Sequence, residues 1–151
     1  MKVASYDIVF QEIPGEVTLA LNLSNCPCHC PGCHSQHLAE DIGEPLDESL
    51  IEDLIGRYKG LITCVAFMGG DAEPEEVARL AHYVRPLKTA WYSGRMNMPT
   101  DEQAFDYVKL GPYIEALGGL KSEKTNQRMY KRVGDKWEDI TAVFWEKTLD
   151  I

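Results

Sequence analysis

The sequence has no hydrophobic run long enough to cross a membrane, which takes about 18 or more consecutive apolar residues. Residues 1–7 contain no hydrophobic core of the signal-peptide kind. There is also no low-complexity tract, no internal repeat and no long linker. We therefore expect a single domain over residues 1–151, located in the cytoplasm, with a length that suits one hydrophobic core.

Basic residues are scarce in this chain. There are 15 Lys and Arg residues against 24 Asp and Glu residues, which gives a formal net charge of −9. Binding to a phosphate backbone requires a basic surface. We therefore expect neither nucleic acid nor a membrane as a partner, whereas basic protein surfaces are compatible with this charge.

Cysteine is abundant in only one place. Four of the five cysteines lie within residues 26–33, which read Cys-Pro-Cys-His-Cys-Pro-Gly-Cys. The fifth, Cys64, lies in the apolar run 61–68 and is expected to be an inert core thiol. Cytoplasmic thiols stay reduced, and an odd number of them fits a metal site better than a set of disulfides. Thiolates this close together can converge on one point, so we expect an inorganic centre there.

Hydrophobic periodicity predicts alternating strands and helices. Strands are expected over 6–13, 17–23, 61–68, 88–93 and 108–116, helices over 47–58, after Pro74 and near 101–107, and a hairpin over 129–133 and 136–140. This order is typical of right-handed βαβ units on a parallel sheet, so we predict an α/β fold. Residues 13–118 would form the core and residues 119–151 a C-terminal hairpin and extension.

Three loops each follow a predicted strand. They are the cysteine loop, the Gly-Gly-Asp turn at 69–71 and the Ser-Gly-Arg turn at 93–95. Loops that follow parallel strands lie at one edge of the sheet, where ligands bind. Tight-turn geometry and a helix start would also explain the sequence at 69–71. The shared edge nevertheless predicts one site built from all three loops.

Cys26, Cys30 and Cys33 have the spacing C-x3-C-x2-C. Three thiolates leave one metal position open, whereas four ligands would complete a zinc site or a fully ligated cluster. Two non-catalytic interpretations remain at this point, an electron-carrying cluster and a structural zinc site that would add nearby histidines (His29, His34, His37). We interpret Cys28, inside the first gap, as a spectator thiol, with a redox role or ligation as alternatives.

A C-x3-C-x2-C loop directly after a core strand resembles the radical S-adenosylmethionine (SAM) superfamily. Residues 26–34, which end in Cys-Pro-Gly-Cys-His, are similar to the activating proteins of anaerobic ribonucleoside-triphosphate reductase. The short chain and the Thr-Asn-Gln-Arg-Met-Tyr segment at 125–130 also resemble that branch. The resemblance implies a partial, open (β/α) barrel with a mostly parallel sheet. It also implies one 4Fe–4S cluster, held by Cys26, Cys30 and Cys33, with SAM chelated by the remaining iron.

The same resemblance implies a set of SAM-binding residues. They are Gly32, Cys33, His34, Gly69, Gly70, Asp71 and Ser93. The turn at 69–71 matches the superfamily's Gly-Gly-Glu type of motif, which meets the methionyl ammonium of SAM. This chain has Asp71 where Glu is commoner, so the backbone role carries over more directly than the side-chain role.

The implied activity is the production of a glycyl radical on the anaerobic reductase. An electron donor, such as a flavodoxin-type protein, reduces the cluster, and the C5′–S bond of SAM breaks to give methionine and a 5′-deoxyadenosyl radical. That radical takes a hydrogen atom from a glycine of the reductase. A complete barrel needs about 250 residues, so a partial one would leave an open side for a peptide loop.

Two alternatives to this function stay open. The first is another small radical SAM enzyme, either an activase of pyruvate formate-lyase or a modifier of a peptide or small molecule. The second is a zinc or iron–sulfur binding module without catalysis.

Overall fold

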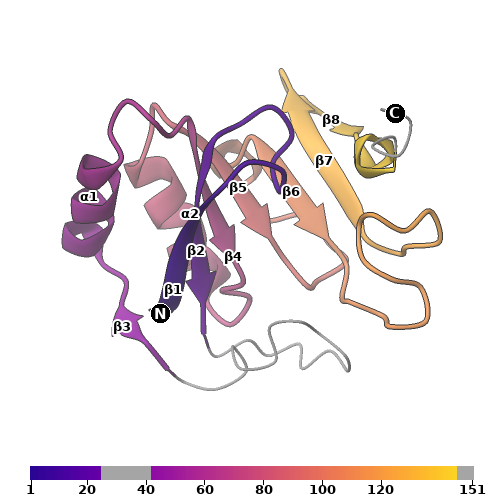
Figure 1. Cartoon of the computed structure of the whole chain (residues 1–151), viewed down its shortest axis with the longest axis horizontal. Coiled ribbons are helices and arrows are strands. Elements are labelled where there is room, and N and C mark those ends of the chain that lie inside the picture. Colours follow the sequence, from indigo (N-terminus) through magenta and orange to yellow (C-terminus); the bar gives the residue numbers. More distant parts are fainter. Residues whose placement is uncertain (25–41, 146–151) are drawn as a thin grey trace.

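The structure of the protein is a computed structural model, and it describes residues 1–24 and 42–145. Within these described residues, eight strands form one sheet in the order β3-β1-β2-β4-β5-β6-β7-β8 (Figure 1). Their bounds are β1 (Lys2–Val9), β2 (Thr18–Leu23), β3 (Glu44–Pro45), β4 (Cys64–Met68), β5 (Lys88–Tyr92), β6 (Tyr107–Leu110), β7 (Arg128–Val133) and β8 (Lys136–Asp139).

The described residues contain two α-helices, α1 (Glu48–Arg57) and α2 (Pro74–Tyr83), and the 3-10 turns η2 (Glu102–Ala104) and η3 (Thr141–Phe144). Asp47 caps α1, since its Oδ1 accepts a hydrogen bond of 2.8 Å from the backbone N–H of Leu50. Pro74 begins α2, where its missing N–H costs nothing. Both helices confirm the sequence prediction, whereas the third helix, expected near 101–107, is only the short turn η2. None of the helices in the described part of the chain is long and apolar enough to cross a membrane.

The centre of the sheet is parallel. β2 pairs with β4, β4 with β5, and β5 with β6, all in parallel. Strand β4 has buried side chains at Cys64, Val65, Ala66 and Phe67, because both faces of the sheet are covered there. This coverage of both faces explains why residues 61–68 form a near-continuous apolar run in the sequence.

The prediction of a partial, open (β/α) barrel with a mostly parallel sheet is wrong. Four of the seven strand pairs are antiparallel, namely β1–β2, β1–β3, β6–β7 and β7–β8, so the sheet is mixed. The physical reason for the antiparallel pairs lies in the segments that connect the strands. A two-residue turn at 134–135 joins β7 to β8, which forces an antiparallel pair. Residues 111–127, between β6 and β7, contain no helix that would return the chain for another parallel strand.

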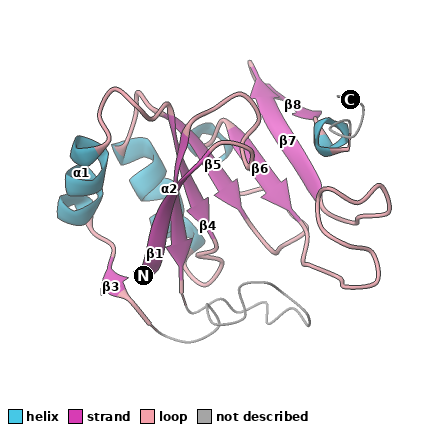
Figure 2. Ribbon diagram, viewed as in Figure 1, coloured by secondary structure: helices cyan, strands magenta, loops and turns pink. Residues whose placement is uncertain are grey.

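The two faces of the sheet are covered differently. Both helices pack on one face, where Ile51 of α1 and Leu80 of α2 join a core with Phe67 and Trp91. The other face carries a second core that includes Ala66, Ala90, Met129, Leu120 and Phe144. Figure 2 shows α1 and α2 next to each other, and η3 beside β7 and β8. The second face is therefore covered by irregular segments rather than by helices.

Cys64 belongs to this second core. Its side chain is fully buried, and burial raises the pKa of the Cys64 thiol to about 12. The prediction of a buried core thiol is confirmed. A thiol that stays protonated is a poor nucleophile and a poor metal ligand.

Candidate functional site

The C-terminal ends of β2, β4 and β5 lie side by side. The parallel register places Asn22 opposite Met68 and Met68 opposite Tyr92, so the three strands end at the same level. Ser24 is the last described residue before the cysteine loop and lies at this edge, since Leu23 ends β2. The predicted loop residues lie outside the described residues (Cys26, Cys30, Gly32, Cys33, His34). The other four predicted residues are described and lie at this edge.

The turn at 69–71 needs its glycines for reasons within the fold. Gly69 and Gly70 have φ angles of 107° and 83°, a region that residues with a Cβ rarely adopt. A Cβ at Gly70 would lie 2.7 Å from Cγ2 of Val77. The carbonyl of Gly69 accepts a hydrogen bond of 2.6 Å from the indole of Trp91. The turn is thus held rigidly against β5 and α2, while its role in SAM binding stays a prediction.

Asp71 and Ser93 contact each other directly. The carboxylate of Asp71 is 1% exposed, and its Oδ1 accepts a hydrogen bond of 2.5 Å from the Ser93 hydroxyl. Its Oδ2 accepts one of 2.9 Å from the backbone N–H of Gly94. The Ser93 oxygen in turn accepts a hydrogen bond of 3.0 Å from the backbone N–H of Arg95. These bonds tie the turn after β4 to the turn after β5.

Arg95 was not among the residues predicted to bind SAM, yet it lies at the same edge. Its Nη2 donates a hydrogen bond of 2.5 Å to the backbone carbonyl of Asp71, and its Nε lies 3.9 Å from Oδ1 of Asp71. The Arg95 side chain is 54% exposed. It therefore places a cation beside a buried carboxylate, with part of the guanidinium open to solvent.

Lys109 also lies at this edge, and unlike Arg95 it belongs to none of the three loops that the sequence predicted to form the site. The backbone carbonyl of Lys109 accepts a hydrogen bond of 2.8 Å from the N–H of Ser93. Its Nζ donates hydrogen bonds to the carbonyls of Ser93 (3.1 Å) and Gly111 (3.0 Å). The Nζ also lies 5.6 Å from the ring centroid of Tyr92, within cation–π range. The available signal was one lysine in the otherwise apolar strand β6.

A cavity of about 630 Å³ adjoins Lys109, and we call it the Lys109 cavity. Its wall includes Glu12, Tyr92, Lys109, Tyr113, Lys121 and Phe144. The Tyr92 hydroxyl donates a hydrogen bond of 2.5 Å to the carbonyl of Glu12, and burial raises the pKa of that hydroxyl above its usual range. This bond fixes the segment after β1 against the end of β5. Leu120 and Phe144 also line the cavity and belong to the second core, so the cavity lies on the face of the sheet opposite to α1 and α2.

The residues at this edge are compatible with a bound group nearby. The hydroxyl of Ser24 is buried and has no hydrogen-bond partner among the described residues. Within the described ranges, no three His, Cys, Asp or Glu side chains form a group that could hold a metal ion. In the sequence, Ser24 is followed by the four cysteines of residues 26–33, and cysteine thiolates are the ligands that iron–sulfur clusters use.

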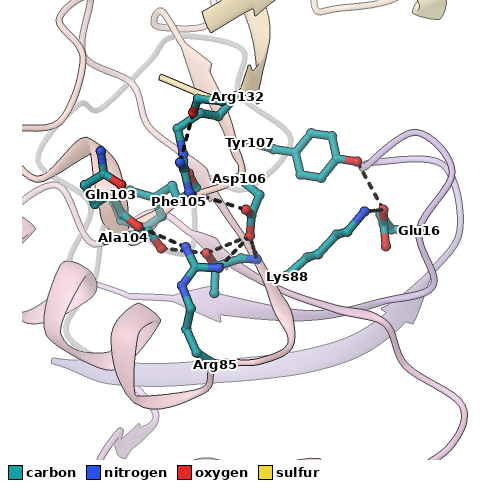
Figure 3. A network of polar contacts seen from close by, with 11 residues as sticks. Glu16, Arg85, Lys88, Gln103, Ala104, Phe105, Asp106, Tyr107 and Arg132 are labelled. Carbon is teal, nitrogen blue, oxygen red and sulfur yellow. Dashed lines mark hydrogen bonds and ion pairs between the residues drawn. The ribbon is translucent and has the colours of Figure 1, made fainter. Parts of the chain in front are cut away.

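A second polar network lies at the opposite edge of the sheet, where the parallel strands begin (Figure 3). There, Oε2 of Glu16 accepts hydrogen bonds of 3.1 Å each from Lys88 and Tyr107. Asp106 accepts one of 3.0 Å from Nη1 of Arg85. Acids and bases here satisfy one another and connect consecutive loops, so we assign this network a structural role.

Comparison with known proteins identifies the family. The family described as a 4Fe-4S single cluster domain matches residues 14–105, which is more than half of the chain. The matched region runs from the loop before β2, through the cysteine loop, to the turn before β6. No curated protein and no solved structure gives a significant match. The chain therefore belongs to the 4Fe-4S single cluster domain family and is a cluster-binding domain.

Proposed function

We propose that this cluster-binding domain is a radical SAM activase that generates a glycyl radical on anaerobic ribonucleoside-triphosphate reductase. One observation carries the proposal: in a single-cluster domain, the cysteine loop, the turn at 69–71 and the turn at 93–95 all follow adjacent parallel strands. Ligands of parallel sheets bind at this edge. A cluster and a second ligand would therefore share one small region.

Cys26, Cys30 and Cys33 would hold the cluster, which leaves one iron without a protein ligand. When bound, the cluster and SAM supply the one-electron chemistry that cleaves the sulfonium and leads to hydrogen-atom abstraction from a glycine. The protein has to hold the reacting groups in line and exclude water. Residues around Asp71 and Ser93 are well suited to that task, because hydrogen bonds already fix their side chains.

The charges at the edge complement the amino-acid part of SAM. The guanidinium of Arg95 is partly open to solvent and would pair with the SAM carboxylate. The backbone of the glycine turn and the carboxylate of Asp71 would face the SAM ammonium, as the family motif implies. Because Asp71 is held by Ser93 and Gly94, its orientation would not have to be established at the moment of binding.

The reductase is proposed as the partner from the Cys-Pro-Gly-Cys-His ending of residues 26–34 and the segment at 125–130. Part of that segment forms a hydrogen-bonded turn before β7, in which the hydroxyl of Thr125 accepts a hydrogen bond of 3.0 Å from the N–H of Gln127. A flavodoxin-type protein is proposed as the electron donor, and the cytoplasm as the compartment, because thiolate ligands require reducing conditions.

The first experiment tests the cluster. We expect anaerobically reconstituted protein to contain four irons and matching sulfide, with brown absorbance. Cys30→Ser should abolish this absorbance, whereas the matched variant Cys28→Ser should retain it. One zinc without visible absorbance would identify a zinc module instead. Loss of the cluster in Cys28→Ser would contradict the ligand assignment.

The second experiment tests the reaction. Dithionite and SAM are added to the reconstituted protein, and 5′-deoxyadenosine is measured by chromatography. An anaerobic reductase is then added, and a glycyl doublet is sought by electron paramagnetic resonance, with a reductase lacking the target glycine as control. A cluster without SAM cleavage would indicate a non-catalytic module. SAM cleavage without a doublet would indicate another small radical SAM enzyme.

A further inference from the structure

We propose that the Lys109 cavity binds a peptide segment of a protein partner, and that Lys109 and Lys121 select segments with a carboxylate side chain. The inference rests on the proposed function, since the segment would be the one that carries the target glycine. It goes further by naming the binding site on this chain and the chemistry of its preferred occupant.

The cavity shares a wall with the candidate SAM edge. Nζ of Lys109 donates to the carbonyl of Ser93, whose hydroxyl donates to Asp71. Lys109 itself lines the cavity. Lys109 thus contacts both the cavity and a residue proposed to hold SAM, so a peptide in the cavity would lie near the reacting groups.

The size and lining of the cavity suit a peptide. A volume of about 630 Å³ falls within the range of about 300–1,000 Å³ that is usual for ligand sites. The residues that line it include three aromatic ones, Tyr92, Tyr113 and Phe144. Hydrogen bonds from Tyr92 to Glu12 and from Nε2 of Gln127 to the carbonyl of Gly111 (3.4 Å) hold the surrounding segments in place. Such a preformed site loses little entropy on binding.

The charge of the cavity gives the preference for a carboxylate. Among the described residues that line it, two are lysines, Lys109 and Lys121, and one is an acid, Glu12, although the chain as a whole has a net charge of −9. Lys109 is partly buried and Lys121 is exposed. A cation with reduced access to water interacts more strongly with an anion than a surface lysine does. A carboxylate beside the peptide's glycine would therefore be favoured over an amide or an amine.

A coupling experiment locates the binding site. The probe is an acetylated and amidated peptide of serine and alanine with a central Gly-Asp pair. A water-soluble carbodiimide joins its one carboxylate to a lysine amine; the amide bond forms with loss of water, which converts the carbodiimide to a urea. Peptide mass mapping then gives the yield at each lysine, and coupling of acetate under the same conditions gives each lysine's intrinsic reactivity.

We expect the peptide-to-acetate ratio at Lys109 or Lys121 to exceed the ratio at Lys59 and Lys136 by roughly fivefold or more. Lys59 and Lys136 are exposed and do not line the cavity, so they serve as internal controls. Equal ratios at all four lysines would overturn the proposal. The experiment is run on the full chain, with its cluster reconstituted, both with and without SAM.

Variants separate selectivity from folding. Lys121→Met should weaken binding of the Gly-Asp peptide by roughly two- to fivefold and leave a matched Gly-Asn peptide unaffected. Lys136→Met should change neither. An equal effect of Lys121→Met on both peptides would contradict carboxylate selection. Since binding needs no reductant, selective binding without SAM cleavage would refute only the proposed activity, and SAM cleavage without selective binding would refute only the peptide site.

Discussion

The hydroxyl of Ser93 donates a hydrogen bond of 2.5 Å to Oδ1 of Asp71, and both residues are almost fully buried. Asp71 follows β4 and Ser93 follows β5, which are parallel neighbours. The bond therefore joins two turns that are 22 residues apart in sequence. It fixes the geometry of the edge at which the cysteine loop also begins.

Asp71→Asn should destabilise the protein by about 1–3 kcal/mol. The substitution replaces one carboxylate oxygen by an NH2 group, which cannot accept a hydrogen bond, so the side chain can no longer accept from both Ser93 and Gly94. Chemical denaturation measures this change. SAM affinity of the reconstituted protein should fall as well. The matched variant Asp53→Asn removes an exposed carboxylate that pairs with Arg57 and should cost less than about 1 kcal/mol. Equal costs for the two variants would contradict a special role of Asp71.

Gly70→Ala should destabilise the protein more than Gly134→Ala. Both positions have positive φ angles, 83° and 63°, so both substitutions cost about 1–2 kcal/mol in backbone strain. A Cβ at Gly70 additionally meets Val77 at 2.7 Å, whereas nothing lies within 4 Å of one at Gly134. The difference between the two unfolding free energies isolates the packing cost. A difference near zero would show that the turn at Gly70 relaxes freely.

The parallel centre of the sheet and the β7–β8 hairpin are predictable from the sequence, and both are confirmed, whereas the antiparallel pairings of β1 and of β6 with β7 are not predictable. The apolar run at 61–68 indicates a strand covered on both faces, and β4 is such a strand. The first strand is expected over 6–13 but occupies Lys2–Val9, because Val3 is its one buried residue and the hydrophobic pattern therefore marks the start of the strand poorly. Residues 111–127 are rich in glycine and connect β6 to an antiparallel β7 without a helix.

The candidate site likewise has one part that the sequence predicts and one part that it does not. Loops after parallel strands meet at one edge, so the proximity of Asp71 and Ser93 follows from topology. The role of Lys109 does not follow from topology, because it depends on which carbonyl its flexible side chain reaches across the β5–β6 pair. Periodicity identifies the strand but carries no information about that contact.

Cys64 should be unreactive in the folded protein. Burial raises the pKa of its thiol to about 12, so almost no thiolate exists at pH 8. In a variant with serine at Cys26, Cys28, Cys30 and Cys33, Ellman's reagent should give no signal at pH 8 until denaturant is added. Rapid reaction of the folded variant would show that β4 opens readily or that the thiol is accessible.

Stability should fall as the pH rises above about 10, the usual pKa of tyrosine. Burial is the main cause that raises the pKa of the Tyr107 hydroxyl, and the negative charge of Glu16 raises it further. Burial also raises the pKa of the Tyr92 hydroxyl. The folded state therefore retains these protons while the unfolded state loses them, so the full stability is present below pH 10 and is lost above it. Denaturation at pH 9 and pH 11 measures the slope. Tyr107→Phe should reduce that slope, and Tyr58→Phe controls for loss of a hydroxyl.

Glu16→Gln should destabilise the fold without weakening SAM binding. Its Oε1 accepts a hydrogen bond of 2.7 Å from Thr63, and its Oε2 accepts hydrogen bonds from Lys88 and Tyr107. An amide nitrogen at either position would face a donor, at a cost of about 1–3 kcal/mol in unfolding free energy. Because this network lies where the parallel strands begin and the candidate site lies where they end, SAM affinity measured by equilibrium dialysis should stay within a factor of about two when the variant is fully folded. A large loss of SAM affinity in the folded variant would show that the two edges of the sheet are energetically coupled, and it would end the assignment of a purely structural role to Glu16.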